Sequence, residues 1–556
     1  MKLLTTQEMR DLEAAANQSG LPYDTMMERA GQATAQVVRD RLEGTGDILV
    51  LVGPGNNGGD GLVAARYLKQ WGHEPTVYIW RRNLSDDPNL ERARGVGLDL
   101  VRADDDSKGR QLCALAASCN VIVDALLGTG IVGGLRGSLP KLLKRIHATL
   151  KKRAGASAPG DDVPTVRPSA AEKMARPCAG GPLIVSVDLP SGLNSDTGEV
   201  DPLALRADCT VTFAAPKRGH YSYPGADWVG ELVVADIGIP TADVACRIEV
   251  AEAQSVAALL PARPSQGHKG TFGKAMVVAG SINYVGAPRL AAEAAYRAGA
   301  GIVTLAIPGA IQGCVSAQLT EPTYLLLPHE LGALKASAAP LLQEALVGYD
   351  ALLIGPGLGQ APETDAFLWG LLSGEREQRT IGFGQTQASA HRAVDLPPLV
   401  LDADGLNLLA GRKGWRKALP KDTVLTPHPG EMARLLGCSI AEVNADRLTV
   451  AQQAAKKWRC TVALKGAYTV VAARDGRQTV IPFANPALAS GGTGDVLAGA
   501  IVGLLAQGMG GYQAAAVGAF LHGMAAEAWR QENGDRGLLA SELLPRIPQA
   551  IKALVG

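Results

Sequence analysis

The sequence predicts an α/β protein of two domains, each built around a mostly parallel sheet. Its 556 residues exceed what a single hydrophobic core commonly serves. A hydrophobic content of 47%, a charged content of 19% and 66 glycines fit a soluble α/β enzyme with many turns between strands and helices. Short apolar strand segments alternate with helix-length segments, and this pattern starts afresh in the second half of the chain.

The charge balance and the cysteine usage exclude several classes of protein. With 54 basic and 54 acidic residues the formal net charge is zero, so we expect neither a nucleic-acid nor a membrane partner. The eight cysteines are scattered without a CxxC pair, and none lies near a histidine at zinc-ligand spacing, which favours free thiols in a reducing compartment. The first residues become polar too soon for a signal peptide, so we expect a cytoplasmic protein.

The first half of the chain is typical of helices followed by a doubly wound parallel sheet. Residues 5–42 show apolar residues at helical spacing around a turn at 20–22, and we expect them to form scaffold or the contact face of a homo-oligomer. A strand at 48–52 runs into the glycine-rich stretch 53–61, and a helix follows from Leu62 to about Trp71. Further strands are expected at 76–80, 121–123, 183–187 and 210–213.

Polar side chains follow several of these strands at their carboxyl ends. The stretch 53–61 matches neither GxGxxG nor a P-loop. Because the carboxyl ends of parallel strands meet at one edge of a sheet, five residues should converge there: Asn57, Asp60, Asp124, Asp188 and Ser191. Any one of these acids alone could simply cap a turn, but three polar loops after three strands favour a site. Oxygen ligands without His or Cys suit a hard cation, and the low ligand charge leaves room for a monovalent ion.

A change of character between residues 234 and 264 marks the domain junction, because prolines bracket a short helix at 252–259. We place the domains at residues 1–240 and 241–556. Two segments lack periodicity and are expected to be exposed insertions, at about 148–181 and about 374–395.

The second half repeats the alternation of strands and helices. Strands are expected at 273–280, 301–307, 351–359, 399–409, 424–429 and 461–472. The apolar region 496–528 is interrupted by polar residues and glycines, so we expect a pair of buried helices there and not a membrane span. Several stretches carry residues suited to chemistry: 284–288, 355–359, 402–407, 426–431 and 465–466.

The glycine turn at 489–499 is the strongest candidate for a reaction centre. Its glycines lead into a helix N-terminus, where backbone N–H groups and the helix dipole favour an anion such as phosphate. Asp495 would repel phosphate, so it is better placed as a base acting on the group that receives the phosphate. The alternative is that Asp495 merely caps the helix.

Two further residues have both a structural and a functional interpretation. His428 lies between two prolines, so it is either a structural histidine or a substrate contact on a rigid loop. Lys465 ends a strand just before Gly466, where it is either a solvated surface lysine or a cation that meets a nucleotide phosphate.

The motifs resemble those of two known families along nearly the whole chain. The first half, with GPGNNGGDG at 53–61, VDALLGTG at 123–130 and VDLPSG at 187–192, resembles the NAD(P)H-hydrate epimerase family. The second half resembles the ADP- or ATP-dependent NAD(P)H-hydrate dehydratase family, through KGTFG, GAP, GPGLG, TPHPGE and GGTGD, which end at residues 273, 288, 359, 431 and 495. The resemblance implies a Rossmann-like doubly wound sheet fused to a ribokinase-like α/β sandwich.

One motif departs from the family pattern. The family has Asn-Pro-Gly-Met-Ala-Thr before its glycine turn, whereas this chain has Asn-Pro-Ala-Leu-Ala-Ser at 485–490. The missing glycine could shift how that loop meets the nucleotide. The two expected insertions also have no counterpart in the pattern.

The resemblance also implies roles for individual residues. In the first domain, Asp188 would be catalytic, and the hydrate would be held by Asn56, Asn57, Gly58, Gly59, Asp60, Gly128, Thr129, Gly130, Ile131, Val132, Gly133, Gly134 and Asp188. Potassium would be bound by Asn57, Asp124 and Ser191. In the second domain, Asp495 would be catalytic, and the hydrate would face Ala287, Gly357, His428 and Asp495. The adenine nucleotide would face Lys465, Gly466, Ala467, Tyr468, Thr469 and Gly494.

The implied activity is repair of hydrated nicotinamide dinucleotides. An enzyme of this kind would interconvert the R and S hydrates of NADH and NADPH (NADHX and NADPHX). It would then dehydrate the S form with Mg²⁺ and ADP, giving AMP and phosphate. A kinase of a small vitamin or sugar would use the same glycine turn but leaves the first 240 residues unexplained. A dinucleotide-dependent oxidoreductase or a dinucleotide sensor would not explain Asp495.

Overall fold

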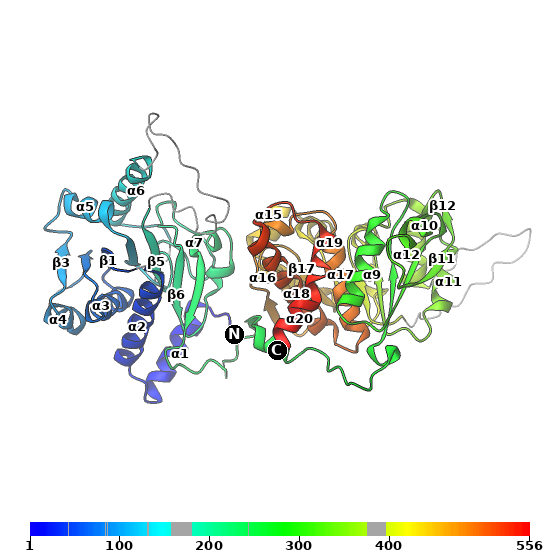
Figure 1. The fold of residues 1–556 in the computed structure, drawn as a ribbon, viewed down its shortest axis with the longest axis horizontal. Coiled ribbons are helices and arrows are strands. Elements are labelled where there is room, and N and C mark those ends of the chain that lie inside the picture. Colours follow the sequence, from blue (N-terminus) through cyan, green and yellow to red (C-terminus); the bar gives the residue numbers. More distant parts are fainter. Residues whose placement is uncertain are drawn as a thin grey trace, which may run out of the picture. The chain divides into compact units, whose positions relative to one another are not determined.

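The computed structural model describes residues 1–42, 44–83, 85, 87–130, 133–156, 181–242, 244–374 and 396–556. The chain divides into two compact units, Met1–Cys246 and Arg247–Gly556, so residues 241–246 are grouped with the first unit (Figure 1). In the described part of the chain, no helix has both the length and the apolar character needed to cross a bilayer.

The first unit contains a seven-stranded sheet in the order β3-β2-β1-β4-β5-β6-β7, and every neighbouring pair is parallel. The strands are β1 Ile48–Val52, β2 Pro75–Ile79, β3 Asp99–Arg102, β4 Val121–Ala125, β5 Leu183–Val187, β6 Cys209–Phe213 and β7 Glu231–Ala235. The chain moves outward from β1 to β3 and then returns to β4 on the other side of β1. The crevice between the ends of β1 and β4 is therefore a topological switch point, where ligands bind in open α/β sheets.

The helices of the first unit include the expected N-terminal pair. They are α1 Thr6–Gln18, α2 Tyr23–Arg41, α3 Asn56–Gln70, α4 Pro88–Gly95, α5 Arg110–Ser118, α6 Leu139–Ala156 and α7 Ala226–Val229. The expected insertion from 148 is wrong at its start, because α6 continues to Ala156. Leu143, Ile146 and Leu150 pack on the core along one face of this helix and extend it. Residues 157–180 lie outside the described residues.

The glycine-rich stretch 53–61 is not the loop that we expected, because α3 already begins at Asn56. Its glycines serve close packing inside the helix. A Cβ on Gly58 would lie 2.1 Å from the carbonyl oxygen of Gly53, and one on Gly61 would lie 2.5 Å from Cβ of Ala125. The turn is therefore confined to the residues before Asn56, and the first turn of α3 lies directly against the strand ends.

The second unit contains a ten-stranded mixed sheet in the order β11-β10-β9-β14-β15-β16-β17-β18-β19-β8. The strands are β8 Ile248–Val250, β9 Lys274–Val278, β10 Ile302–Pro308, β11 Thr323–Leu327, β14 Ala351–Ile354, β15 Leu399–Leu401, β16 Val424–Leu425, β17 Thr461–Leu464, β18 Val470–Ala472 and β19 Gln478–Val480. A separate antiparallel pair is formed by β12 His329–Glu330 and β13 Ala333–Leu334. The strand order reverses between β9 and β14, so this unit has its own switch point.

Several of the expected strands were too long, and the segments 351–359 and 424–429 contain only the short strands β14 and β16. The segment 399–409 contains only the short strand β15 before helix α13 (Asp404–Ala410) begins. The segment 461–472 is an antiparallel hairpin of β17 and β18, because the backbone at Gly466 and Tyr468 has positive φ angles of 139° and 53° and reverses the chain. The sheet is therefore not wholly parallel.

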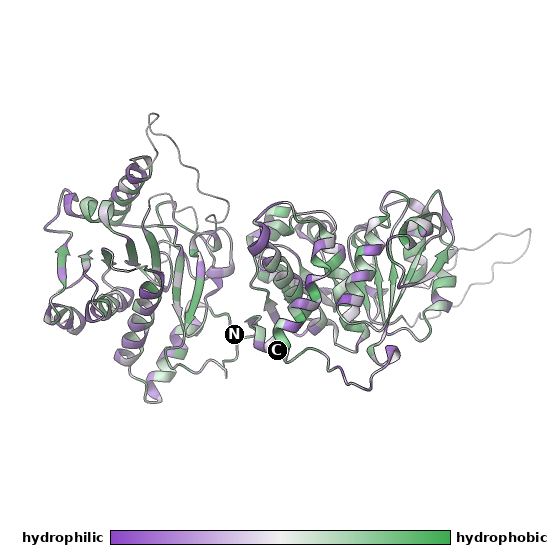
Figure 2. Cartoon of the chain, viewed as in Figure 1, coloured by the Kyte–Doolittle hydropathy of each residue, from purple (hydrophilic) through white to green (hydrophobic). Residues whose placement is uncertain are grey.

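Helices cover the second sheet, and the expected buried pair is present as α17 Thr493–Ala506 and α18 Gly511–Asn533. The other helices are α8 Ala253–Ala257, α9 Gly286–Arg297, α10 Gln312–Ser316, α11 Ala338–Ala345, α12 Pro362–Ser373, α13, α14 Pro429–Leu436, α15 Ile440–Ala445, α16 Arg447–Trp458, α19 Ala540–Leu543 and α20 Arg546–Val555. Figure 2 shows how strongly hydrophobic the central helices and strands of this unit are. Gly374 ends α12, and residues 375–395 lie outside the described residues.

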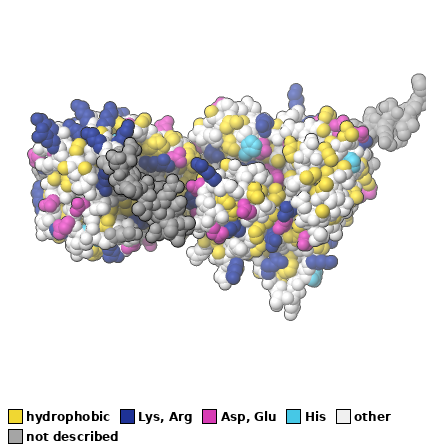
Figure 3. Space-filling view, turned by 45° about the horizontal axis from the view of Figure 1, so that its top comes forward, with side chains coloured by type: hydrophobic (Ala, Val, Ile, Leu, Met, Phe, Trp, Pro, Cys, Tyr) yellow, Lys and Arg dark blue, Asp and Glu magenta, His cyan; other side chains and the backbone are white. Residues whose placement is uncertain are grey.

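The helices α9 and α17 pack at close range through glycine. A Cβ on Gly499 would lie 2.2 Å from the carbonyl oxygen of Ala291, and one on Gly503 would lie 2.5 Å from that of Ala295. This contact fixes the N-terminus of α17, and with it the glycine turn, relative to the sheet. On the face shown in Figure 3, basic and acidic side chains are interspersed over the second unit.

Candidate active sites

The first candidate site lies at the switch point of the first sheet, where the expected cation ligands come together. The Oγ of Ser191 donates a hydrogen bond to Oδ1 of Asp124 at 2.6 Å, and the Ser191 N–H donates to Oδ2 at 2.8 Å. Asn57 donates from Nδ2 to the carbonyl oxygen of Leu127 at 3.0 Å. Residues from α3 and from the loops after β4 and β5 thus meet at one edge, as the strand-end pattern predicted.

The unpaired oxygen at this edge fits a cation. Oδ1 of Asn57 is buried without a hydrogen-bond partner among the described residues. Burial also raises the pKa of Asp124, although Ser191 opposes the shift, and a bound cation would relieve that cost. Within the described residues no group of three or more His, Cys, Asp or Glu is placed to hold a metal. Amide, hydroxyl and carbonyl oxygens around one carboxylate suit a weakly charged, hard ion.

Asp188 follows β5 with its backbone in the left-handed region, at φ 63°. Its Oδ1 accepts hydrogen bonds from Nζ of Lys217 at 2.6 Å and from Oγ1 of Thr212 at 2.9 Å. Burial alone would raise the pKa of Asp188, but the charge and hydrogen bond of Lys217 outweigh it, so the pKa lies below its ordinary value. Asp188 is therefore an ionised carboxylate at neutral pH, which is the state that a base requires.

Lys217 is a site residue that the sequence reasoning missed. Its position could have been found by the rule already applied to the acids, because it follows the end of β6 within the polar stretch Lys-Arg-Gly-His at 217–220. The search for strand-end residues considered only acids and their polar neighbours, so this lysine was overlooked. In the structure its side chain is only 2% exposed.

The pKa of Asp60 is shifted in the opposite direction from that of Asp188. Asp60 is buried on α3, and desolvation together with the charge of Asp188 raises its pKa well above the ordinary value. Glu13 on α1 also belongs to this group, because burial raises its pKa and the charges of Lys217 and Asp188 act on it in opposite directions. Two carboxyl groups whose pKa values are shifted in opposite directions are the pattern expected of an acid and a base.

The remaining residues expected to hold the hydrate lie around the same edge. Gly128 is next to Asn57, since a Cβ on Gly128 would lie 3.3 Å from Cβ of Asn57. Thr129, Gly130, Gly133 and Gly134 follow in the same loop after β4, whereas Ile131 and Val132 lie outside the described residues. Arg82 was missed, and its Nη1 donates to the carbonyl oxygens of Gly53 and Gly55 at 3.0 and 2.9 Å beside the start of α3.

The second candidate site surrounds the glycine turn before α17. The N-cap of this helix is Gly492, and no side chain caps it. The alternative that Asp495 is the helix cap is therefore wrong, because Asp495 is the third residue of the helix and lies in its first turn. Burial raises the pKa of Asp495 to about 7, and the charge of Asp402 adds to the shift. A carboxyl with this pKa can exchange a proton near neutral pH.

Lys465 is not a solvated surface lysine, so that alternative is also wrong. Its Nζ lies 2.5 Å from Oδ1 of Asp402 and 3.9 Å from Oε2 of Glu431, and its side chain is 16% exposed. A Cβ on Gly494 would lie 3.3 Å from this Nζ, so the ammonium group reaches the glycine turn. Oδ2 of Asp402 is buried without a hydrogen-bond partner among the described residues.

The structure gives His428 a structural role, and its expected contact with the substrate stays a prediction. It is the N-cap of α14, with Nδ1 accepting a hydrogen bond from the Gly430 N–H at 3.0 Å. Its Nε2 lies 3.2 Å from Oε1 of Glu431, yet half of the side chain remains exposed. The His428 contacts and the charge of Lys465 overcome the effect of burial and lower the pKa of Glu431. His428 thus holds a buried carboxylate in place while keeping a face open.

Ala287 and Gly357 lie next to each other at the switch point of the second sheet. A Cβ on Gly357 would lie 2.9 Å from Cβ of Ala287 and 2.7 Å from Cβ of Tyr284. A cavity of about 490 Å³ lies beside them, and its lining includes Tyr284, Leu358 and Asp404. Its position after β9 and β14 is where a flat ring could enter the site.

The expected nucleotide segment 465–469 forms the turn of the β17–β18 hairpin. Oγ1 of Thr469 donates to the carbonyl oxygen of Gly466 at 3.0 Å, and Arg447 donates to the carbonyl oxygens of Leu464 and Lys465. Ala467 and Tyr468 lie between them. The turn is therefore held from within, and one end of it is the ammonium group next to Gly494.

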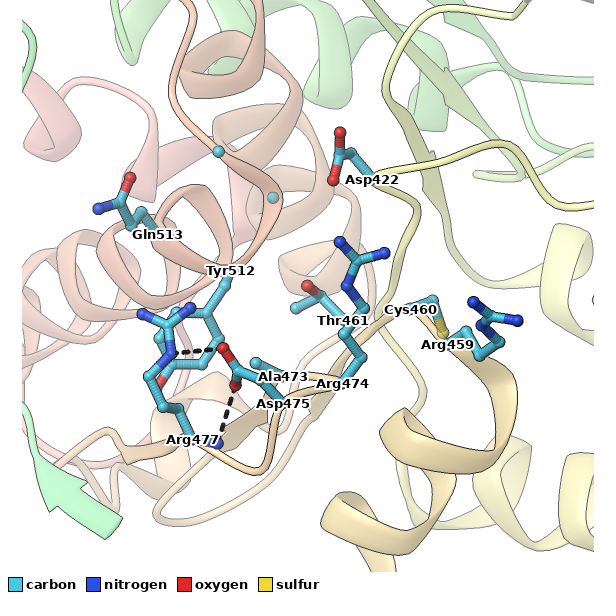
Figure 4. Close-up of a pocket in the computed structure, with 12 residues that line it drawn as sticks. Asp422, Arg459, Cys460, Thr461, Ala473, Arg474, Asp475, Arg477, Tyr512 and Gln513 are labelled. Carbon is cyan, nitrogen blue, oxygen red and sulfur yellow. Dashed lines mark hydrogen bonds and ion pairs between the residues drawn. The ribbon is translucent and has the colours of Figure 1, made fainter. Parts of the chain in front are cut away.

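A further pocket lies at the other end of β17 (Figure 4). It has a volume of about 330 Å³ and is lined by Thr461 together with Arg459, Arg474 and Arg477. Thr461 begins β17, whereas Lys465 follows its end, so this pocket and the glycine turn occupy opposite edges of the sheet. The described residues that line it include none of the expected site residues.

Comparisons with known proteins match both halves of the chain. Residues 23–219 match the family model described as YjeF-related protein N-terminus, and residues 275–549 match the model described as NAD(P)H-hydrate dehydratase. The bifunctional NAD(P)H-hydrate repair enzyme Nnr of Moorella thermoacetica is 36% identical over 100% of this chain and 97% of its own length. The enzyme of the same name from Escherichia coli is 34% identical over 97% of this chain and 91% of its own length.

Among solved structures, the ADP/ATP-dependent NAD(P)H-hydrate dehydratase of Bacillus subtilis, co-crystallised with ATP and Mg²⁺, is also similar. It is 31% identical, with a TM-score of 0.45, over 55% of this chain and 98% of that chain.

Proposed function

The chain belongs to the family of bifunctional NAD(P)H-hydrate repair enzymes, and from this premise we propose which residues perform each half of the reaction. It is an enzyme with an NAD(P)H-hydrate epimerase domain of Rossmann-like fold and a nucleotide-dependent NAD(P)H-hydrate dehydratase domain of ribokinase-like fold. The observation that carries the proposal is that each unit has a carboxyl group with a shifted pKa at the switch point of its own sheet, Asp188 in the first unit and Asp495 in the second. We assign epimerisation to the Asp188 site and dehydration to the Asp495 site.

In the epimerase site, Asp188 would move the proton that accompanies loss and return of water. The hydrate is a hemiaminal, so the lone pair of the ring nitrogen can expel the hydroxide and erase the configuration at that carbon. As an ionised carboxylate, Asp188 would take a proton from the incoming water on the opposite face and return it to the hydroxide in the reverse direction. Asn57, Asp124 and Ser191 would hold a potassium ion, which would supply positive charge beside the phosphate-binding end of α3.

In the dehydratase site, Asp495 would be the base for transfer of phosphate to the hydrate hydroxyl. Hydroxide is a poor leaving group at neutral pH, whereas phosphate is a good one. After the transfer, the ring nitrogen would expel phosphate, and loss of a neighbouring proton would restore the dihydronicotinamide. The Lys465 ammonium and the amides of the glycine turn would stabilise the charge of the transferring group.

We also propose ADP as the phosphate donor, bound at the segment 465–469 with Mg²⁺ on its phosphates. An electrostatic observation supports the magnesium ion. Three carboxyl groups, those of Asp402, Glu431 and Asp495, surround the single ammonium group of Lys465. This excess of acid would repel a free diphosphate, and a magnesium ion on the nucleotide would offset the repulsion.

We further propose a homo-oligomer in the cytoplasm that acts on small molecules and does not bind nucleic acid. The described part of the chain contains seven cysteines and no disulfide between them, which favours a reducing compartment. Tyr23, half exposed at the start of α2, supports an oligomer contact at the N-terminal helices. The zero net charge gives no electrostatic attraction for a nucleic acid.

One assay tests the assignment against a small-molecule kinase. The protein is incubated with ADP or ATP and either hydrated NADH or a panel of vitamin alcohols. Return of the dihydronicotinamide absorbance with release of phosphate supports the proposed dehydration, and the faster nucleotide identifies the donor. Accumulation of a stable phosphoester without any return of absorbance would instead support a kinase.

A further inference from the structure

Lys217 is buried in the first unit and makes three polar contacts through one ammonium group. Its Nζ donates to Oδ1 of Asp188 at 2.6 Å, to Oγ1 of Thr212 at 2.7 Å and to the carbonyl oxygen of Phe213 at 3.4 Å. The side chain is only 2% exposed. Burying an ammonium group costs free energy unless it is paired, so a lysine here requires a specific partner. Asp188 is the one charged acceptor among these contacts.

The backbone that carries Lys217 is held in place from two sides. Leu4 forms a bridge to it, with the Leu4 N–H donating to the Pro216 carbonyl at 3.0 Å and the Arg218 N–H donating to the Leu4 carbonyl at 3.1 Å. On the other side, the imidazole of His220 accepts from the Lys217 N–H at 3.1 Å through Nδ1. The position of the ammonium group is therefore fixed by the fold.

The same short segment also holds the backbone of Asp188. Nε2 of His220 lies 3.0 Å from the Asp188 carbonyl oxygen. Burial lowers the pKa of His220 to about 4, so the ring is neutral and donates this hydrogen bond from Nε2. The left-handed backbone of Asp188 is strained for a residue with a side chain, and the hydrogen bond to His220 helps to maintain it. Lys217 and His220 thus fix the side chain and the backbone of the same residue.

The two oxygens of Asp188 have different surroundings as a result. Oδ1 is saturated by Lys217 and Thr212, whereas Oδ2 has no hydrogen-bond partner among the described residues. The Asp188 side chain is 13% exposed, so Oδ2 is the oxygen left for a proton. The other titratable groups that act on this cluster are Glu13 on α1, Asp60 on α3 and His220.

We propose that Lys217 is a positioning residue of the epimerase, which keeps Asp188 ionised and presents Oδ2 to the water that is gained and lost. The inference rests on the proposed role of Asp188 in epimerisation. In one direction the water O–H bond breaks and its proton passes to Oδ2, and in the other direction the same proton returns to the departing hydroxide. Lys217 itself takes no part in the proton transfer and does not contact the substrate.

The test is the pH dependence of R to S interconversion, followed by chromatographic separation of the two hydrates. For Lys217→Met and Lys217→Ala we expect at least about a 100-fold loss at pH 7. We also expect the rise of activity with pH to move to higher pH, because Asp188 would lose the cation that favours its charged form. Added ethylamine should partly restore the rate of Lys217→Ala. In Thr212→Val, which keeps the ion pair, the pH profile should stay in place.

Dehydration of the purified S hydrate by the same preparations shows whether the protein is intact. An unshifted pH profile in Lys217→Met, or a loss that ethylamine cannot restore in an intact Lys217→Ala, would overturn the inference. If Lys217→Met loses both epimerisation and dehydration, that variant is not intact and says nothing about the role of Lys217. The ethylamine titration of Lys217→Ala then decides whether the inference stands. Asp188→Asn is measured alongside, because normal epimerisation by that variant would refute the proposed role of Asp188 and the role of Lys217 with it. Slow epimerisation by Asp188→Asn together with an unshifted pH profile in Lys217→Met would refute the role of Lys217 alone.

Discussion

Lys465 and Asp402 form a buried ion pair, with Nζ 2.5 Å from Oδ1, at the point where the glycine turn meets the sheet. The two residues follow β17 and β15, and Thr426 after β16 donates to the same carboxylate oxygen at 2.8 Å. Three neighbouring strands thus combine to hold one ammonium group beside Gly494. A lysine fixed in this way can meet a phosphate without the entropy cost of ordering a free side chain.

The first prediction concerns the pH dependence of dehydration. A base with a pKa of about 7 must lose its proton to act, so the dehydration rate should rise as the pH passes through about 7. Asp402→Asn removes the nearest like charge that raises the pKa of Asp495, so this rise should move to lower pH. The measurement is kcat/KM for the S hydrate from pH 5 to 9. A profile that is unchanged in Asp402→Asn would contradict the coupling of the two acids.

The second prediction separates the two reactions. Asp188→Asn removes the ionised carboxylate of the first site, so R to S interconversion should fall at least about 100-fold. Nucleotide-dependent dehydration of the S hydrate should persist, because the second unit contains its own acids. Asp99→Asn, at an exposed position on β3, is the matched control and should keep both activities. Loss of both reactions in Asp188→Asn would count against the assignment of one reaction to each unit.

The third prediction concerns potassium. Wild-type protein should melt at a higher temperature in KCl than in choline chloride of equal ionic strength, because an ion that binds only the folded state stabilises it. Ser191→Ala removes the hydroxyl that contacts Asp124, so the potassium-dependent increase should shrink. Ser118→Ala, on the exposed end of α5, is the control. Equal melting temperatures of the wild type in the two salts would argue against a potassium site.

Much of the fold could be predicted because strand ends carry a strong signal. Apolar runs such as 48–52 and 183–187 became strands with the expected bounds. Weaker sequence signals gave wrong predictions where tertiary contacts determine the local structure. The helix α3 absorbs glycines that look like a loop in the sequence, since their lack of a Cβ serves packing against Met27 and Ala125 and not a turn. The periodicity of the sequence does not distinguish a glycine that packs inside a helix from a glycine that forms a turn.

The sites were predicted in the same uneven way. Acids at strand ends were found because the carboxyl ends of parallel strands meet at one edge of a sheet, and Asp124 and Ser191 do meet as expected. The basic partners were missed or underrated because Lys217 and Lys465 are indistinguishable from surface lysines in sequence. Their role depends on which acid the fold brings opposite them, and that pairing joins residues 29 and 63 positions apart.

The fourth prediction tests the packing that fixes the glycine turn. In Gly499→Ala the new Cβ would lie 2.2 Å from the Ala291 carbonyl oxygen, which cannot move without displacing α9. We expect a loss of stability of about 1–3 kcal/mol, measured by denaturant unfolding of the second unit's transition. Gly313→Ala is the matched control, because no atom lies within 4 Å of its added Cβ. Equal stability of the two variants would show that α9 and α17 can separate at little cost.

The last prediction separates catalysis from stability at Asp495. Asp495→Asn should still bind adenine nucleotide and still epimerise, but it should dehydrate at least about 100-fold more slowly, because the base is lost. The stability of this variant should rise relative to the wild type although its activity falls. Burial raises the pKa of Asp495 from 3.8 to about 7, so between these values the folded protein holds a proton that the unfolded chain has released. Wild-type stability should therefore fall as the pH rises through this window.

The free-energy cost of ionising the buried Asp495 in the folded protein is fully present above pH 7. Asp495→Asn should therefore be more stable than the wild type at pH 8, by up to about 4 kcal/mol. The difference should vanish below pH 4, where both states of the wild type are protonated. Melting temperatures of the two proteins between pH 4 and 8, with kcat measured at pH 8, check both parts. A variant that is less stable at pH 8 and still dehydrates at a near-normal rate would mean that Asp495 supports the helix and does not act in the reaction.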